Sequence, residues 1–145
     1  MTADLSKPAE IAWACLVRVQ QSSIARVEDA LRNAGFPPLI WYDILLELER
    51  IETGDLRQRD LQREMLLKRY SITRLVDRME AAGLLAREAC EEDARGSIVR
   101  ITDQGRTLRQ SMWTVYADAV SEHFAGRFND YELDRLGELL GRLRD

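Results

Sequence analysis

Apolar residues recur at intervals of three and four along most of this chain, a spacing typical of helices that bury one face. The pattern changes after residue 83, where two short segments alternate apolar and polar residues. It therefore predicts a mainly α protein with a small antiparallel β hairpin. The six expected helices run over residues 8–33, 40–51, 59–66, 69–82, 102–124 and onward from 129.

Glycines and capping residues set the boundaries of these segments. Gly35 follows the first helix, and Gly83 stands where a left-handed residue would end the fourth. Thr102 is suited to the start of the fifth helix, because its hydroxyl can accept a hydrogen bond from a free backbone N–H. The sequence Asn129-Asp130-Tyr131-Glu132 has the spacing of a capping box and opens the sixth.

The fourth helix and the segments after it predict a DNA-reading module. Apolar residues fall at i, i+3, i+4 and i+7 from Ile72, whereas hydroxyl and guanidinium side chains fall on the opposite side. The segments from Leu84 to Cys90 and from Ser97 to Thr102 indicate two strands, joined by the polar turn from Glu91 to Gly96. This order is typical of a winged helix-turn-helix, whose helix enters the major groove and whose hairpin, the wing, reaches an adjacent minor groove.

Length and composition fit one soluble unit. The chain has 145 residues, a length sufficient to bury a hydrophobic core. Its 46% hydrophobic and 32% charged residues are typical of a soluble protein. The apolar runs are far shorter than a membrane span, and the first eight residues lack the basic and apolar regions of a secretory signal. The two cysteines, Cys15 and Cys90, lie far apart in sequence, which favours reduced thiols and a cytoplasmic protein.

The formal net charge of −4 argues against a nucleic-acid-binding protein, but the distribution of charge does not. The segment from Arg57 to Arg78 holds seven basic and three acidic residues, a net of +4, which leaves −8 for the rest of the chain. Attraction to phosphate is local, since charges more than about 10 Å apart are screened at ordinary salt. A basic patch on an acidic body can therefore bind DNA, although an arginine-rich solvated helix gives the same count.

Five short motifs, in this order, resemble the MarR family of bacterial transcriptional regulators. They lie in the second helix, in the fourth helix, and at the opening, tip and close of the wing: Trp41-Tyr42-Asp43-Ile44-Leu45-Leu46-Glu47-Leu48, Thr73-Arg74-Leu75-Val76-Asp77-Arg78-Met79-Glu80, Gly83-Leu84-Leu85 with Arg87, Asp93-x-Arg95-Gly96, and Ile101-Thr102-Asp103-Gln104-Gly105. The likeness spans nearly the whole chain. Where family members often carry Ser, Thr or Asp near the starts of helices three and four, this chain has Arg59, Lys68 and Tyr70. These residues weaken the expected caps and strengthen phosphate contact.

The resemblance implies a single MarR-type unit over residues 1–145. A winged-helix DNA-binding lobe would occupy about residues 37–102, and helices in residues 8–35 and 103–145 would form the dimerisation region of a homodimer. The resemblance also implies a small-molecule or oxidant input that loosens DNA binding. Leucines from Leu133 to Leu143 repeat at coiled-coil spacing in the last helix, as a helical dimer contact would require.

The candidate DNA contacts divide by the part of the duplex they would reach. Ser71, Thr73 and Arg74 lie in the first turns of the fourth helix, where Arg74 can bind O6 and N7 of guanine. Arg95, beside a glycine at the wing tip, is expected to enter the minor groove. The resemblance implies that Asp93 orients the wing through an ion pair. Phosphate contacts are assigned to Arg57, Arg59, Lys68, Arg69 and Arg78, the last with Asp77 as an alternative partner.

A ligand pocket and a thiol sensor are weighed against plainer roles. The pocket would lie between the dimer region and the reading lobe, lined by Trp13, Trp41, Leu45, Trp113 and Tyr116. Aromatic walls suit a planar aromatic or phenolic acid, although aromatic residues at helical spacing are more often core. Cys15 has apolar neighbours and is expected to be an inert buried thiol, whereas Cys90 lies on the wing, where oxidation would perturb DNA contact.

The sequence shows no enzyme or metal chemistry. His123 is the single histidine, no Cys/His cluster has zinc spacing, and no phosphate-binding glycine loop or nucleophile elbow occurs. We expect no cofactor, no metal and no enzymatic activity. The sequence predicts a cytoplasmic, homodimeric regulator that binds a pseudo-palindromic double-stranded DNA operator, a repressor released by a small aromatic or phenolic ligand. The alternatives are an oxidant-responsive thiol regulator, a winged-helix protein-interaction module without DNA binding, and a small-molecule-binding protein or minor enzyme.

Overall fold

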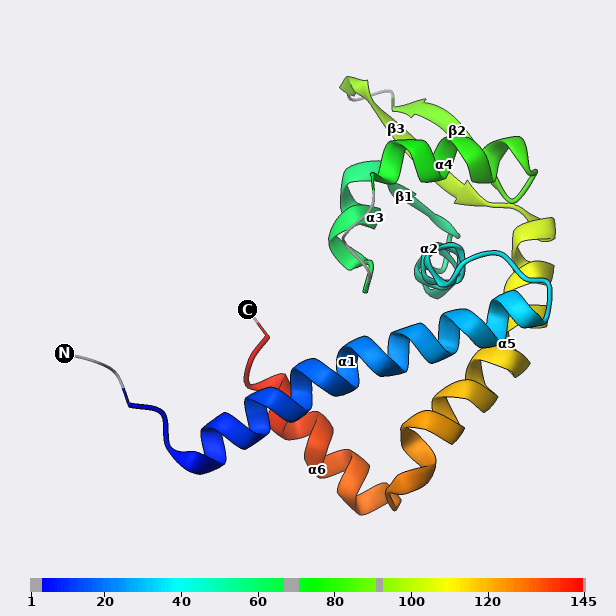
Figure 1. Ribbon diagram of the computed structural model, residues 1–145. Coiled ribbons are helices and arrows are strands. Elements are labelled where there is room, and N and C mark those ends of the chain that lie inside the picture. The colour runs from blue at the N-terminus through cyan, green and yellow to red at the C-terminus, as the bar shows by residue number, and fades with distance from the viewer. Residues whose placement is uncertain (1–3, 67–70, 91–92, 145) are drawn as a thin grey trace. The chain divides into compact units, whose positions relative to one another are not determined.

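The computed structural model describes residues 4–66, 71–90 and 93–144, with all side chains in these ranges except those of residues 93–95. The described residues form six α-helices, a short 3-10 helix and three strands, and Figure 1 labels the α-helices and the strands. In chain order these are α1 (Lys7–Asn33), α2 (Leu39–Arg50), β1 (Asp55–Arg57), α3 (Gln58–Glu64), α4 (Ile72–Ala81), β2 (Leu85–Cys90), β3 (Asp93–Ile101), α5 (Asp103–His123), η1 (Ala125–Arg127) and α6 (Asp130–Gly141). The predicted fold class, mainly α with a small antiparallel sheet, is confirmed.

The chain divides into two compact units. Residues 31–115 form the winged-helix unit, which holds α2 to β3 with the end of α1 and the first part of α5. Residues 1–30 and 116–145 form the terminal unit. The lobe predicted over residues 37–102 lies inside the winged-helix unit. None of the helices in the described residues is both long and apolar enough to cross a membrane.

One hydrophobic core holds the winged-helix unit together. The buried face of α4 is the one that the sequence predicts, formed by Ile72, Leu75, Val76 and Met79. It packs with Ile44 of α2, Leu61 of α3 and Val99 of β3, none of which keeps accessible surface. Burying side chains of this size contributes about 1.5–3 kcal/mol each. The core therefore fixes the position of α4 and leaves its opposite face to solvent.

The sheet is antiparallel, with β3 between β1 and β2. The predicted turn over residues 91–96 is wrong in its extent: β3 begins at Asp93, which pairs with Cys90, so residues 93–96 belong to a strand. Backbone hydrogen bonds across a hairpin do not require apolar side chains, and a polar strand therefore resembles a turn in sequence. The strand β1 is not predicted from the sequence, because Gly54 indicates only the end of a helix.

Thr102 joins the end of α4 to the start of α5. Its hydroxyl accepts from the backbone N–H of Gly105 at 3.0 Å, as predicted for a cap, and donates to the carbonyl of Gly83 at 2.7 Å. Gly83 adopts the predicted left-handed conformation, with φ of +80°. The backbone N–H of Thr102 also donates to the carbonyl of Leu84 at 3.1 Å. The two helices are therefore connected through one residue.

The remaining helix starts differ in how they are capped. Asn129 and Glu132 form the predicted capping box of α6, with hydrogen bonds of 2.8 and 3.0 Å. In contrast, α3 follows Arg57 and α4 follows Ser71 without a side-chain hydrogen bond to the first turn. This agrees with the weak caps expected at these two starts.

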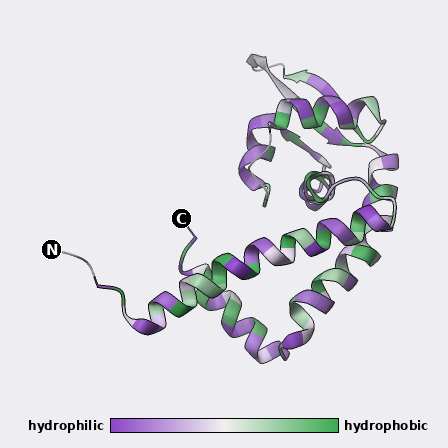
Figure 2. Cartoon of the chain, in the orientation of Figure 1, coloured by the Kyte–Doolittle hydropathy of each residue, from purple (hydrophilic) through white to green (hydrophobic). Residues whose placement is uncertain are grey.

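The terminal unit exposes much apolar surface. No described residue of α6 is buried. Trp13 of α1 is 66% exposed, Tyr131 of α6 is 78% exposed and Leu143 is 71% exposed. Figure 2 shows hydrophobic residues recurring along both α1 and α6. Side chains from α1, α6 and the segment between α5 and α6 line an apolar cavity of about 550 Å³.

Candidate nucleic-acid interface

The exposed face of α4 carries the side chains predicted to read DNA. Thr73, Arg74, Asp77 and Arg78 are all exposed, and Ser71 is exposed just before the helix. Within the described residues, neither Arg74 nor Arg78 forms an ion pair, so the alternative pairing of Arg78 with Asp77 is not observed. Both guanidinium groups are free to bind a phosphate or a base edge.

Arg87 of β2 binds the acidic groups of this helix. Its guanidinium forms ion pairs with Asp77 and with Glu80, the latter at 3.1 Å, and its backbone N–H donates to Glu80 at 3.0 Å. The hydrogen bond that the Arg87 guanidinium donates to Glu80 is the main cause that raises the pKa of Arg87 above its ordinary value, with a smaller contribution from the hydrogen bond to Asp77. Because the wing neutralises these carboxylates, the charge of the exposed α4 face is dominated by its two arginines.

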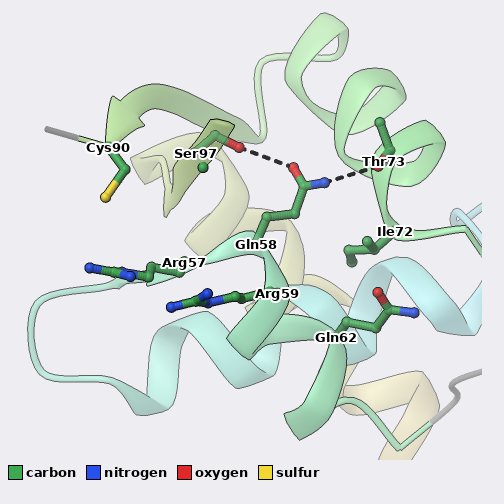
Figure 3. A pocket seen from close by; sticks show the side chains of 9 residues that line it. Arg57, Gln58, Arg59, Gln62, Ile72, Thr73, Cys90 and Ser97 are labelled. Carbon is green, nitrogen blue, oxygen red and sulfur yellow. Dashed lines mark hydrogen bonds between the residues drawn. The ribbon is translucent and has the colours of Figure 1, made fainter. Parts of the chain in front are cut away.

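Gln58 connects three elements at the N-terminal end of α4 (Figure 3). Its side-chain amide N–H donates to the hydroxyl of Thr73 at 3.0 Å, and its side-chain oxygen accepts from the hydroxyl of Ser97 at 3.3 Å. Gln58 is the first residue of α3, Thr73 lies in the first turn of α4, and Ser97 lies in β3. Together with Arg57 and Arg59, they line a cavity of about 290 Å³.

The predicted phosphate contacts are placed in part. Arg59 is exposed and Arg57 is half-buried, and both line the cavity in Figure 3. The side chains of four predicted contacts lie outside the part of the chain that the structure describes: Lys68, Arg69, Asp93 and Arg95. The backbone of residues 93–95 belongs to β3, which places them in the wing. The roles of these four side chains stay predictions.

Comparison with known proteins agrees with this geometry. Residues 34–96, from the end of α1 into β3, match the model of the MarR family. AbsC, a MarR family transcriptional regulator from Streptomyces coelicolor, is 27% identical in sequence. Its structure matches 98% of this chain and 95% of its own, with a TM-score of 0.83. Over residues 34–96 in sequence, and over nearly the whole chain in fold, this protein is similar to MarR family regulators.

Two further solved structures extend the comparison. Sco3205, a MarR family regulator from Streptomyces coelicolor solved in complex with DNA, is 22% identical, with a TM-score of 0.84 over 99% of this chain and 89% of its own. BpsR from Bordetella bronchiseptica, whose DNA binding is regulated by 6-hydroxynicotinic acid, is 21% identical, with a TM-score of 0.78 over 92% and 98%. At these identities the likeness shows the fold.

One sequence relative covers a shorter stretch. YdgJ from Bacillus subtilis strain 168, an uncharacterised HTH-type transcriptional regulator, is 36% identical over 57 residues. The matched stretch is 39% of this chain and only about a third, 35%, of YdgJ. AbsC and YdgJ are both described as transcriptional regulators.

The five residues predicted to line a ligand pocket lie in different environments. Leu45 is completely buried, and Trp41 packs half-buried against the same core. Trp13 lines the apolar cavity of the terminal unit, Trp113 is exposed and Tyr116 is half-buried. Since these residues divide between the two units, a pocket shared by all five stays a prediction.

Cys15 differs from the expected arrangement, whereas Cys90 lies on the wing as expected. Cys15, expected to be buried, is exposed on α1 and lines the apolar cavity. Apolar neighbours in sequence do not bury a helical residue, because successive residues point to different sides of a helix. Cys90 ends β2 and is buried. Among the described residues, no group of three or more His, Cys, Asp or Glu side chains lies close enough to hold a metal ion.

Gln58 and Arg87 hold the interface together, yet neither is among the predicted contacts. The spacing of Asp77 and Glu80, three residues apart on α4, indicates that one cation from another element could bind both. That pattern could have identified Arg87. The role of Gln58 could not be predicted in this way, because a single glutamine at the start of a helix is common in proteins.

Proposed function

We propose that this protein is a sequence-specific transcriptional regulator that binds double-stranded DNA through α4 and the wing. The observation that supports it best is the exposed face of α4, where Arg74 and Arg78 have no acidic partner among the described residues while Arg87 binds Asp77 and Glu80. Such a helix offers positive charge to phosphates and hydrogen-bond donors to base edges. Sco3205, which shares the fold, was solved in complex with DNA.

Each element has a proposed contact. Arg74 binds a guanine in the major groove, worth about 1–3 kcal/mol of discrimination against other bases. Arg78, one turn further along α4, contacts a phosphate, as do the cations at the start of α3. Arg95 reaches the minor groove beside the wing, where a narrow groove concentrates negative potential. Phosphate contacts position the protein, and contacts with base edges supply the sequence preference.

We propose further that the terminal unit forms a homodimer. An α6 without buried residues, beside an apolar cavity that Leu136 and Leu140 help to line, is expected to pack against a second copy of this chain. Two-fold symmetry would then place two recognition helices in successive major grooves, about one helical turn apart, on a pseudo-palindromic operator. The cytoplasm is the compartment that this proposal assigns to the protein.

For regulation we propose repression that a small aromatic or phenolic ligand relieves. BpsR, similar in fold, supports a ligand of this class, because 6-hydroxynicotinic acid regulates its DNA binding. A ligand releases DNA only if it binds the two conformations of the protein with different affinity, and such coupling is typically about 1–3 kcal/mol. Oxidation of Cys15 is a second candidate input, since this thiol is exposed.

The test begins with wild-type protein and a random duplex library, from which the tightest-binding DNA is selected. Fluorescence anisotropy then compares the selected duplex with a shuffled duplex of equal length over a range of salt concentrations. We expect Arg74→Ala to lower affinity for the selected duplex at least tenfold, with a smaller loss on the shuffled duplex. The logarithm of affinity should fall linearly with the logarithm of salt concentration.

Arg135→Ala supplies the matched control. Arg135 is an exposed arginine of α6 that pairs with Glu138 at 3.1 Å, outside the winged-helix unit, so its loss should leave DNA affinity unchanged. A wild-type protein that binds neither duplex, or binds both without salt dependence, would contradict the proposal. That result would favour a winged-helix protein-interaction module.

A further inference from the structure

We propose that Gln58 is a positioning residue that makes Thr73 a hydrogen-bond donor toward DNA. This inference rests on the proposed function, because it concerns how α4 reads a base. Gln58 itself need not touch DNA. It acts through its hydrogen bond to the exposed hydroxyl of Thr73, in the first turn of the recognition helix.

The hydrogen-bond chain fixes the role of each atom. A hydroxyl has one hydrogen to donate and two lone pairs to accept with. The Thr73 oxygen accepts from Nε2 of Gln58 at 3.0 Å, so its own hydrogen remains to be donated outward. The Ser97 hydroxyl donates its hydrogen to Oε1 of Gln58 at 3.3 Å and thereby holds the other end of the amide. In Figure 3 Gln58 lies between the two hydroxyl groups.

A donor at this place discriminates among bases. In the major groove guanine, adenine and thymine each present an acceptor, whereas cytosine presents only the donor group at N4. With its hydrogen held available for donation outward, Thr73 favours the three bases that present an acceptor over cytosine at the position it contacts. Without the bridge the hydrogen can be directed elsewhere, and this preference would relax.

The same bridge joins the two DNA-reading elements. Gln58 on α3 is bonded at once to α4 and to β3 of the wing, so it restrains the first turn of α4 relative to the wing. Gln62, one turn later on α3, lines the same cavity but bonds to neither Thr73 nor Ser97 among the described residues. Gln62 therefore serves as a control, because it has the same side chain at nearly the same place but does not form the bridge.

The test uses full-length variants and the duplex selected with the wild type, together with every single-base variant of that duplex. In Gln58→Glu the carboxylate can only accept, so it takes the hydrogen of Thr73 and turns a lone pair outward. Gln62→Glu adds the same charge without this reversal. We expect Gln58→Glu to bind the selected duplex about tenfold more weakly than Gln62→Glu does, and to gain relative affinity for cytosine at one position.

Two further variants separate the bridge from charge and from folding. Gln58→Leu breaks the bridge without adding charge and should weaken discrimination against cytosine at that same position. Thr73→Val removes the hydroxyl, and combining it with Gln58→Glu should cause no further change in base preference, as expected for residues that act as one unit. Circular dichroism and thermal melting show whether each variant is folded.

The outcomes distinguish this inference from the proposed function. Wild-type protein without any base preference would overturn both. A second outcome would overturn the role of Gln58 alone. In it the wild type has a base preference, and Gln58→Glu and Gln58→Leu keep the same preference at every position as Gln62→Glu does. A shift toward cytosine at one position, absent in Gln62→Glu, supports it.

Discussion

Replacing Arg87 by methionine should weaken DNA binding although Arg87 itself need not contact DNA. The methionine keeps most of the apolar stem but removes the guanidinium that binds Asp77 and Glu80. Asp77 is then free to attract Arg74, which lies three residues earlier on the same helix. The arginine proposed to read guanine would pair within its own helix instead.

The magnitude follows from the exposure of the three side chains. The side chain of Arg87 is 25% exposed, that of Glu80 39% and that of Asp77 53%, so solvent screens both ion pairs. Exposed pairs contribute about 0.2–1 kcal/mol each. For two pairs we therefore expect the free energy of unfolding to fall by about 0.4–2 kcal/mol. The loss of a base contact should lower DNA affinity about tenfold, or 1.4 kcal/mol.

Arg100→Met is the matched control. Arg100 of β3 also binds two carboxylates, Asp55 at 3.3 Å and Glu88 at 3.4 Å, but both lie on the sheet and not on α4. Urea unfolding and anisotropy titration of both variants separate stability from binding. We expect similar losses of stability and a loss of affinity confined to Arg87→Met.

A second substitution tests the cause. In Arg87→Met combined with Asp77→Asn, no carboxylate remains at position 77 to attract Arg74, and part of the lost affinity should return. The reasoning is refuted if Arg87→Met binds the selected duplex as tightly as Arg100→Met under conditions where both are folded. Failure of the double variant to recover affinity would refute the proposed diversion of Arg74.

Three further predictions concern packing, ionisation and assembly. Gly105→Ala should lower the free energy of unfolding by about 1–3 kcal/mol in urea titrations, because its Cβ would overlap the carbonyl oxygen of Leu84. Gly137→Ala, whose Cβ meets nothing within 4 Å, should not lower the free energy of unfolding. Burial raises the pKa of Glu47 above its ordinary 4.5, so its ionised form costs stability at neutral pH. Glu47→Gln should therefore be more stable than wild type at pH 7, by a margin that shrinks as the pH falls toward 4.5, and a margin independent of pH in urea titrations would contradict this. Leu140→Glu should shift the sedimentation coefficient from dimer to monomer, and an unchanged dimer would place the contact elsewhere.

Much of the winged-helix unit could be predicted because its sequence and its packing obey the same periodicity. The apolar spacing of α4 from Ile72 gives both its buried face and the face left for DNA. The left-handed Gly83, the hydrogen bond from Gly105 to Thr102 and the capping box at Asn129 are local features, and each needs only near neighbours in sequence to form. Elements that satisfy their own hydrogen bonds locally are the ones that the sequence predicts well.

The parts that could not be predicted depend on partners distant in sequence. The strand β1 has three residues and forms only because β3 lies beside it, 43 residues later at the pair Leu56 and Val99. Gln58 gains its role from Ser97, 39 residues away. Exposure of Cys15 depends on which side of α1 finds a partner, a question that local hydrophobicity does not answer. In each case tertiary contact decides what the local sequence leaves open.

The hydroxyl of Thr102 links the ends of two helices. One oxygen holds Gly83 at the end of α4 and Gly105 in the first turn of α5, so neither helix end can slide without stretching a bond to the other. The long helix that starts at this link continues from the winged-helix unit into the terminal unit. A movement of the first turn of α5 would therefore reach the C-terminal end of α4 through the hydroxyl of Thr102.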